Sequence, residues 1–478
     1  MTNWKGILRW PLVAVLAVGL AGCDLEVLNP GSIQDADLST PDLMPILVAG
    51  VSAEYNDVQD YLAMNIGRLS DDLAGTGSYG STQRYRQGIV DNNDTGALWE
   101  QAHESAWAAG EAWDRLQLVL EGAASSDAGA ARVFMLMGHA HNRLGENFCD
   151  LVYDVGSVQP REAAFDSAII AFNQAITIGA AAGSDADDYV LSAYAGIAQA
   201  RLGKASVGTG TWQAAFDAAQ DFFDNGGTEQ WFDYAIYHPQ ANTNLMWNET
   251  HGRAEVGVWT TQAQQMFDAT GDIRVAYTKC GEWVDTSRPN PDPGMGVHDQ
   301  GCSSGSGAHQ GADGLTAHYR QDKYDDRGSD IPRASGVEMR MIQAEAMLMM
   351  GDISAATGMT MYLNLARASY NDPSLPPLAE PATVGTLDFR DQYPHYAMEG
   401  DADWDAWSML DAERYATTWI EGKRLSDIMR WDHPFLAGGF LAKNVPGAAA
   451  VAQRVSCLPI PKVECDLNPN VTDSPACG

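Results

Sequence analysis

The feature that most constrains this fold is a helical spacing of small residues between residues 94 and 225. Alanine recurs there at intervals of three and four, as at Ala102, Ala106 and Ala109, and strand-like alternation is scarce. This period places small side chains on one face of a helix, where a second helix can approach closely. The stretch therefore predicts helices packed against one another rather than a sheet.

The same pattern places individual helices. It predicts helices at 130–146 and 165–178, then a pair formed by 194–203 and a helix that starts at Trp212. A further pair is expected at 341–350 and 355–368. Helix pairs with small residues at their crossings are typical of tetratricopeptide repeats, in which neighbouring pairs share one continuous core. We therefore expect an all-α dominated chain with a tetratricopeptide-like helical-repeat scaffold at about 94–225 and 336–431.

Residues 228–335 break this helical rhythm. They are rich in glycine, proline, asparagine and aromatic residues and predict long loops with short irregular elements. Long structured loops on a helical frame often carry functional residues. We expect a single domain, 23–478, that contains a loop-rich subdomain at about 228–335 and a C-terminal tail at 455–478.

The N-terminus has the pattern of a bacterial secretion signal. Lys5 and Arg9 precede an apolar run at 11–20, which is shorter than the ~20 residues that a membrane-spanning helix needs. The next residues, Leu20-Ala21-Gly22-Cys23, resemble the lipobox of lipoprotein signals. This resemblance implies that 1–22 is a signal peptide and that Cys23 becomes the lipidated N-terminus of a soluble body.

The charge balance excludes one class of partner. Asp and Glu number 63 against 29 Lys and Arg, for a net charge of −34. Removal of 1–22 takes away Lys5 and Arg9 and no acid, so the mature charge is −34 − 2 = −36. Nucleic-acid binding needs clustered cations, which this chain lacks. We expect no nucleic-acid partner and a body that stands off from anionic lipid headgroups.

Six cysteines remain besides Cys23, and an even number in an exported protein indicates disulfides. Fifteen connectivities exist for six cysteines. Two pairs bracket short loops, Cys280 with Cys302 and Cys465 with Cys477, so local pairing is the simplest expectation and leaves Cys149 with Cys457. Free or metal-binding cysteines are the alternative.

Motifs for catalysis, metals and cofactors lack their structural context. Residues 75–80 match the dinucleotide fingerprint by letters, and 301–305 match the nucleophile elbow, but neither follows a predicted strand. His139 and His141 are two apart, which points them to different sides of a helix. Carboxylates are too abundant for any pair to be selected by spacing. We expect no enzyme activity, no metal and no cofactor.

Several short motifs occur in order along the chain, from about 23 to 470. They are Cys23 to Pro30, Ser70-Asp71-Asp72, Lys323-Tyr324, Glu338 to Ala346, Glu413-Arg414, Glu421 to Ile428 with Arg430-Trp431, and Leu458 to Glu464 with Asn468-Pro469-Asn470. Together they resemble the SusD/RagB family of outer-membrane nutrient-binding lipoproteins. The extra cysteines and the 280–302 loop depart from the family pattern.

This resemblance implies four tetratricopeptide-like helix pairs in a SusD-like α-α superhelix. It also implies a lipid-anchored, surface-exposed outer-membrane protein that delivers a nutrient, most often an oligosaccharide, to a TonB-dependent SusC-like barrel. The acidic Asp24 and Glu26 after Cys23 leave the target membrane open without the host. Three alternatives remain: uptake of peptides or other bulky nutrients, a tetratricopeptide-type adaptor that binds proteins, and a surface-attached hydrolase.

Sugar binding favours exposed aromatic platforms flanked by polar side chains, and each such ring has the alternative role of covering core. A second set of residues, Glu421, Arg424, Asp427 and Arg430, recurs at steps of three and predicts ion pairs on one helix face that order the core. The candidate ligand residues are Tyr79, Arg84, Tyr85, Trp247, Trp283, Tyr319 and Tyr324.

Overall fold

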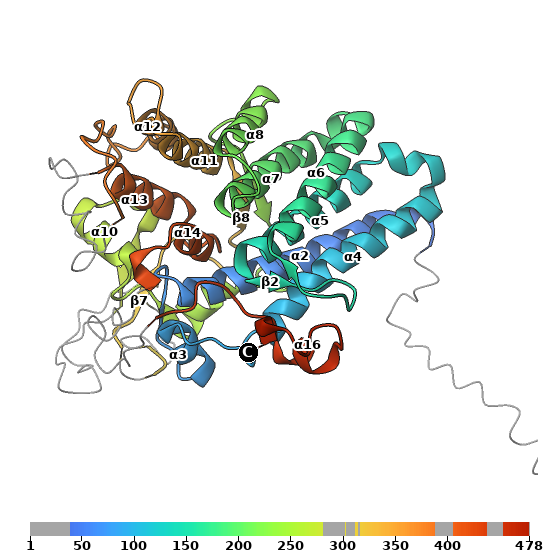
Figure 1. The fold of residues 1–478 in the computed structure, drawn as a ribbon, viewed down its shortest axis with the longest axis horizontal. Coiled ribbons are helices and arrows are strands. Elements are labelled where there is room, and N and C mark those ends of the chain that lie inside the picture. Colours follow the sequence, from blue (N-terminus) through green and yellow to red (C-terminus); the bar gives the residue numbers. More distant parts are fainter. Residues whose placement is uncertain are drawn as a thin grey trace, which may run out of the picture.

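The computed structural model describes residues 39–280, 302, 311–313, 316–387, 405–436 and 453–477. The predicted signal peptide, the lipidation site Cys23 and the candidate ligand residue Trp283 lie outside these residues. The described part is dominated by helices, as expected, with short strands between them (Figure 1).

Eight helices form the main row of the molecule. They pack as the pairs α2 with α4, α5 with α6, α7 with α8, and α11 with α12. The first helices of the pairs also contact one another in succession, α2 with α5, α5 with α7 and α7 with α11. This is the packing of tetratricopeptide repeats, and Figure 1 shows the row from α4 to α12. The bounds are α2 Met44–Leu69, α4 Gly96–Leu120, α5 Ala128–Asn147, α6 Glu162–Ala182, α7 Asp187–Ser206, α8 Trp212–Asp224, α11 Gly336–Met349 and α12 Met359–Ser369.

The helical spacing predicted most of this row. The pairs α7 with α8 and α11 with α12 are confirmed, although α12 begins at Met359 rather than 355. The helix at 165–178 is the middle of α6, which is long and apolar enough to cross a membrane but lies packed between α5 and α7. Helix α2 was not predicted, because its buried face carries polar residues such as Gln59, Asp60 and Asn65 among the apolar ones.

Two phenylalanines explain why the repeat needs glycine. Phe165 and Phe172, seven residues apart on α6, are fully buried. A Cβ atom added at Gly196 on α7 would lie 2.1 Å from the Phe172 ring, and one added at Gly138 on α5 would lie 2.5 Å from it. Phe165 meets a second pair of glycines, Gly145 and Gly203, one heptad further along the same two helices. We call this apolar unit of α5, α6 and α7 the glycine-phenylalanine stack.

The segment between α8 and α11 carries short elements, as expected for the loop-rich insert. Four two-stranded antiparallel sheets occur among the described residues, pairing β1 with β5, β2 with β3, β4 with β8, and β6 with β7. Their bounds are β1 Ala74–Gly75, β2 Asp150–Leu151, β3 Gln159–Pro160, β4 Phe232–Ala235, β5 Val256–Gly257, β6 Tyr277–Lys279, β7 Tyr319–Gln321 and β8 Ile331–Ser335. The segment between α8 and α11 also carries α9 Leu245–Trp247, the π-helix η5 Asn248–Gly252 and α10 Gln262–Thr270, and a further short helix, α3 Gly80–Gln87, follows β1.

Two helices after the repeat row, α13 Ala406–Thr418 and α14 Arg424–Arg430, carry a buried set of ion pairs that we call the charged junction. Arg424 binds Asp71 and Asp411 with N–O distances of 2.6 Å each, and all three side chains are at most 2% exposed. Burial alone would raise the pKa of Asp427, but Arg414 and Arg430 beside it hold that pKa below its usual value.

The predicted ion-pair role is thus present, but its geometry differs from the expectation. Glu421 precedes α14 rather than sharing its face, and it pairs with Lys323 at 2.7 Å. Arg430 binds Asp427 within the helix at 2.6 Å and also reaches Glu345 on α11 at 2.6 Å. Helix α14 therefore contributes only some members of an ion-pair network that connects several segments far apart in the sequence.

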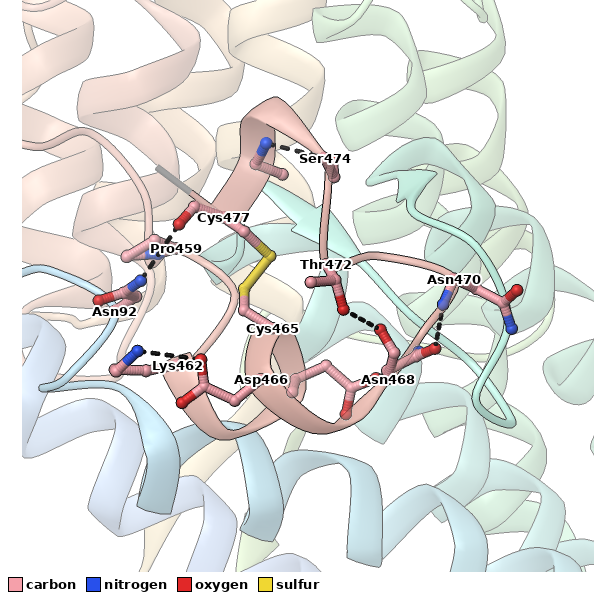
Figure 2. Close-up of a disulfide and its surroundings, with 12 residues drawn as sticks. Asn92, Pro459, Lys462, Cys465, Asp466, Asn468, Asn470, Thr472, Ser474 and Cys477 are labelled. Carbon is pink, nitrogen blue, oxygen red and sulfur yellow. Dashed lines mark hydrogen bonds and ion pairs between the residues drawn. A yellow bond between two sulfur atoms is a disulfide. The ribbon is translucent and has the colours of Figure 1, made fainter.

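Three disulfides form with the pairing expected from the sequence. Cys149 joins Cys457, Cys280 joins Cys302, and Cys465 joins Cys477. The last bridge closes the tail around α16 Lys462–Leu467, as Figure 2 shows. The first bridge fixes the tail to the end of α5, where the Leu458 carbonyl also accepts a hydrogen bond from the Cys149 N–H at 3.0 Å.

Candidate functional site

Two aromatic residues of the candidate set remain accessible, and one segment of the chain links them. The Tyr79 side chain is 55% exposed, and Trp247 is partly exposed. Each ring faces a guanidinium group, Tyr79 that of Arg253 at 5.4 Å and Trp247 that of Arg327 at 5.0 Å. Segment 247–253 carries both Trp247 and Arg253, so we refer to the group as the Tyr79–Trp247 surface.

Tyr79 is positioned by the small sheet of β1 and β5. The Thr76 N–H donates to the Glu255 carbonyl at 2.9 Å, and the Ser78 N–H donates to the Glu255 carboxylate at 3.2 Å. A Cβ atom at Gly77 would lie 2.0 Å from that carboxylate, so a larger residue there would displace the Glu255 carboxylate from this position. The sheet therefore fixes the Tyr79 loop against the segment that carries Arg253.

Arg253 connects the two halves of the surface. Its guanidinium donates to the Tyr79 hydroxyl at 2.9 Å and to Glu249 at 3.0 Å. Glu249 is buried, and burial raises its pKa above the usual value despite the opposing charges of Arg253 and Arg68. The proximity of Glu249 raises the pKa of Arg253, which therefore stays charged. Tyr79 thus presents a ring whose hydroxyl and orientation are both fixed.

Besides Arg327, three further contacts hold Trp247. Its indole N–H donates to the Asp325 carbonyl at 3.1 Å, and its ring stacks on His251 at 5.8 Å between centroids and 8° between planes. The Asn244 side chain accepts from the Trp247 backbone N–H at 2.8 Å. Burial lowers the pKa of His251 to about 3, with Arg320 and His318 adding to the effect, so the stacked imidazole is neutral at physiological pH.

This arrangement can bind, by stacking and hydrogen bonding, a ligand with flat apolar faces and polar edges. Aromatic faces supply the apolar contact, and the exposed Asp325, Asp326 and Arg327 supply donors and acceptors beside it. Within the described residues, no group of three or more His, Cys, Asp and Glu side chains could hold a metal ion.

Similarity to known proteins is found for the structure of this chain but not for its sequence. No protein-family model matches the sequence, and no curated protein matches it. Solved structures do match. A SusD/RagB family protein from Bacteroides thetaiotaomicron has a TM-score of 0.61 at 13% identity, with 90% of this chain and 95% of that chain covered. The chain has the SusD/RagB fold.

Two further structures with the SusD-like fold bind known glycans. A chitin-binding SusD homolog from Flavobacterium johnsoniae matches with a TM-score of 0.59 at 12% identity, covering 89% of this chain and 94% of that one. A laminarin-binding SusD-like protein matches with a TM-score of 0.52 at 13% identity, covering 89% of this chain and 98% of that one. The fold resemblance drawn from the sequence motifs is therefore confirmed by structure.

Within the SusD-like frame, three of the candidate ligand residues are buried. Tyr85, Tyr319 and Tyr324 are 3%, 5% and 2% exposed. Tyr85 lies under the Arg68 guanidinium at 5.6 Å, and Tyr319 stacks on Tyr277 at 5.3 Å. So little of each ring reaches the surface that these tyrosines support the fold beneath the site rather than offering a platform.

Arg84 is accessible but is engaged by its own loop. Its guanidinium binds Asp91 at 2.7 Å and Asp94 at 2.8 Å, with 38% of the side chain exposed. Arg84 lies on α3, next to the Tyr79 loop. Its ion pairs with Asp91 and Asp94 close the turn that follows this helix. Of the seven candidates, Tyr79 and Trp247 are the two aromatic residues that the described structure leaves available to a ligand.

Sequence reasoning did not select the residues that position these rings. Arg253, Glu249, His251 and Arg327 lie in the insert and have no motif spacing. One signal was present: a tryptophan followed four residues later by a histidine is a helical spacing that stacks two rings on one face. The contact between Arg253 and Tyr79 joins residues 174 apart in sequence and could not be read from a local pattern.

Proposed function

We propose that this protein is a surface lipoprotein of the outer membrane that binds an oligosaccharide on the Tyr79–Trp247 surface. The observation that carries the proposal is the pair of accessible aromatic rings, each fixed by an arginine, on the SusD fold. The shared fold with chitin-binding and laminarin-binding proteins supports a glycan as the ligand class. A neutral glycan also needs no charge complementarity from a chain with a net charge of −34.

Calorimetric titration with chitin and laminarin oligosaccharides tests the binding. We expect Tyr79→Ala and Trp247→Ala each to weaken binding by about tenfold or more, since about 1.4 kcal/mol of lost stacking is a tenfold change. Trp107→Ala is the matched control, because Trp107 is 63% exposed but lies on α4, outside the surface. Equal losses in all three variants, or binding of peptides in place of glycans, would contradict the glycan proposal.

The proposed delivery role requires a partner. The predicted lipid anchor at Cys23 and the SusD fold support a complex with a TonB-dependent SusC-like barrel in the outer membrane. Affinity purification of the lipidated protein from detergent-solubilised outer membranes, followed by mass spectrometry, tests this. Recovery of the barrel in near-equal amount supports delivery, and recovery of the protein alone or with soluble partners would argue for an adaptor instead.

A further inference from the structure

A buried carboxyl group binds the start of the short helix that carries the tryptophan of the proposed ligand surface. Asp60, on α2, is 5% exposed, and its Oδ2 atom accepts a hydrogen bond from the Leu245 N–H at 2.9 Å. Leu245 is the first residue of α9, the turn that ends with Trp247. Asp60 therefore joins the repeat scaffold to the start of the segment that presents the aromatic ring.

Near Trp247, the polar anchors of Asn244 and of the Trp247 indole come from one loop, 325–329. The Asn244 N–H donates to the Arg327 carbonyl at 2.9 Å, and its side chain donates to the Ser329 carbonyl at 2.7 Å. The Trp247 indole donates to Asp325 in the same loop. Asp60 differs from these anchors because it lies on a long helix of the scaffold and because it can titrate.

We propose that Asp60 is a positioning residue for Trp247: its neutral carboxyl group holds the start of α9 on α2, and its ionisation favours release of the segment. The inference rests on the proposed function only for the role of Trp247 as a ligand platform. The hydrogen bond between Asp60 and the Leu245 N–H, which positions the segment, is a property of the ligand-free protein.

The surroundings of Asp60 disfavour its charge. Burial raises the pKa of Asp60 to about 8, and the nearby Asp57 adds to this, while the Leu245 and Tyr61 N–H groups oppose it. From the end of β4, the Tyr237 phenol also faces Asp60. Within the described part of the chain, no cation is among the groups that shift the pKa of Asp60, and Arg333, which acts on Tyr237, is bound to Asp233 at 2.8 Å. The charge of an ionised Asp60 is therefore stabilised mainly by water, which reaches the carboxylate when residues 244–253 separate from α2.

Linkage gives the direction of the pH dependence. In the closed state the pKa of Asp60 is about 8, whereas in a solvated, open state it returns toward the usual 3.8. The closed state thus binds more protons between these two values. The opening equilibrium should increase with pH in this window, by up to about tenfold per pH unit, and level off above about pH 8.

Hydrogen exchange measured by mass spectrometry tests directly whether Asp60 keeps residues 244–253 closed against α2. Peptides covering 244–253 are followed from pH 5 to 9 in the ligand-free protein, with correction for the intrinsic exchange rate. We expect protection in the wild type to fall as pH rises to about 8. Asp60→Asn keeps an oxygen acceptor for Leu245 without the charge, so its protection should be independent of pH and higher than that of the wild type at pH 8. The exposed Asp188→Asn is the matched control and should follow the wild type.

Two results would overturn the inference. One is wild-type protection of 244–253 that does not change between pH 5 and 8, which needs no variant to interpret. The other is an Asp60→Asn protein that keeps the wild-type pH dependence.

A separate titration with laminarin oligosaccharide at pH 6 and pH 9 distinguishes this inference from the proposed function. Weaker binding at pH 9 in the wild type, together with constant binding in Asp60→Asn, would show that the positioning of Trp247 by Asp60 affects ligand binding. If no glycan binds but the exchange data follow the expectation, the proposed function fails and the positioning role stands. If glycan binds but the exchange data do not follow it, the positioning role fails alone.

Discussion

The glycine-phenylalanine stack and the charged junction are both fully buried, yet they are held by opposite chemistry. In the stack, Phe172 packs against Gly138 and Gly196, and the contacts are apolar. In the junction, Arg424, Asp71 and Asp411 are at most 2% exposed and carry charges. When apolar packing loses a contact, the cost follows the volume of the cavity that is left, whereas a buried charge that loses its partner is destabilising because its desolvation is no longer compensated. The comparison shows that burial alone does not say how a region responds to change.

The largest expected effect comes from removing one partner of the junction. Arg424→Met leaves the carboxylates of Asp71 and Asp411 buried without their cation, and we expect a loss of about 3–5 kcal/mol in the free energy of unfolding. Urea denaturation followed by circular dichroism measures it. Arg201→Met, at a half-buried position of α7, is the control and should change stability by less than about 1 kcal/mol.

A repair variant sharpens this test. Replacing Asp71 and Asp411 with leucine in the Arg424→Met background removes the two buried carboxylates that Arg424 neutralises, so part of the lost stability should return. If Arg424→Met alone were as stable as the wild type, the junction would not be held by these ion pairs. If the repair variant were less stable than the single variant, shape rather than charge would dominate.

The second effect tests the stack. Gly196→Ala places a Cβ atom 2.1 Å from the Phe172 ring, and such overpacking should cost about 1–3 kcal/mol in the free energy of unfolding. Gly110→Ala on α4 is the matched control, since nothing lies within 4 Å of its added Cβ atom. That control should instead gain about 0.5–1 kcal/mol, because alanine favours the helix. Equal effects of the two substitutions would show that the close contact is not needed.

The two regions also differ in how much of them the sequence could predict. The stack follows from a local period, since alanine and glycine at steps of three and four mark the close faces of α5 to α7. The junction joins Arg424 to Asp71, which is 353 residues away, and no local pattern specifies that partner. Steps of three around α14 predicted ion pairs correctly but placed Glu421 on the wrong element, because the helix begins only at Arg424.

The candidate site divides in the same way. Composition identified the aromatic loops, and the structure leaves Tyr79 and Trp247 accessible. The burial of Tyr319 and Tyr324 depends on segments packed from elsewhere in the chain, such as the Ile420 carbonyl that accepts from the Tyr324 hydroxyl at 3.4 Å. A loop aromatic in a sequence therefore predicts a contact, but only the tertiary structure decides whether that contact is with a ligand or with the core.

The smallest expected effect isolates burial from ion-pair geometry. Lys462 and Asp466 on α16 form a pair at 2.9 Å, close to the 2.6 Å between Arg424 and Asp411, but the side chains are 54% and 56% exposed (Figure 2). We expect Lys462→Ala to change the free energy of unfolding by less than about 0.5 kcal/mol, because water and salt screen the charges and an unpaired Asp466 stays hydrated. Denaturation at low and high salt measures this, and the backbone bond from the Lys462 N–H to the Asn92 carbonyl is kept in the variant. A loss near that of Arg424→Met would mean that distance, rather than desolvation, sets the strength of ion pairs in this fold. A small loss assigns the difference between the two variants to the burial of the junction carboxylates that lose Arg424.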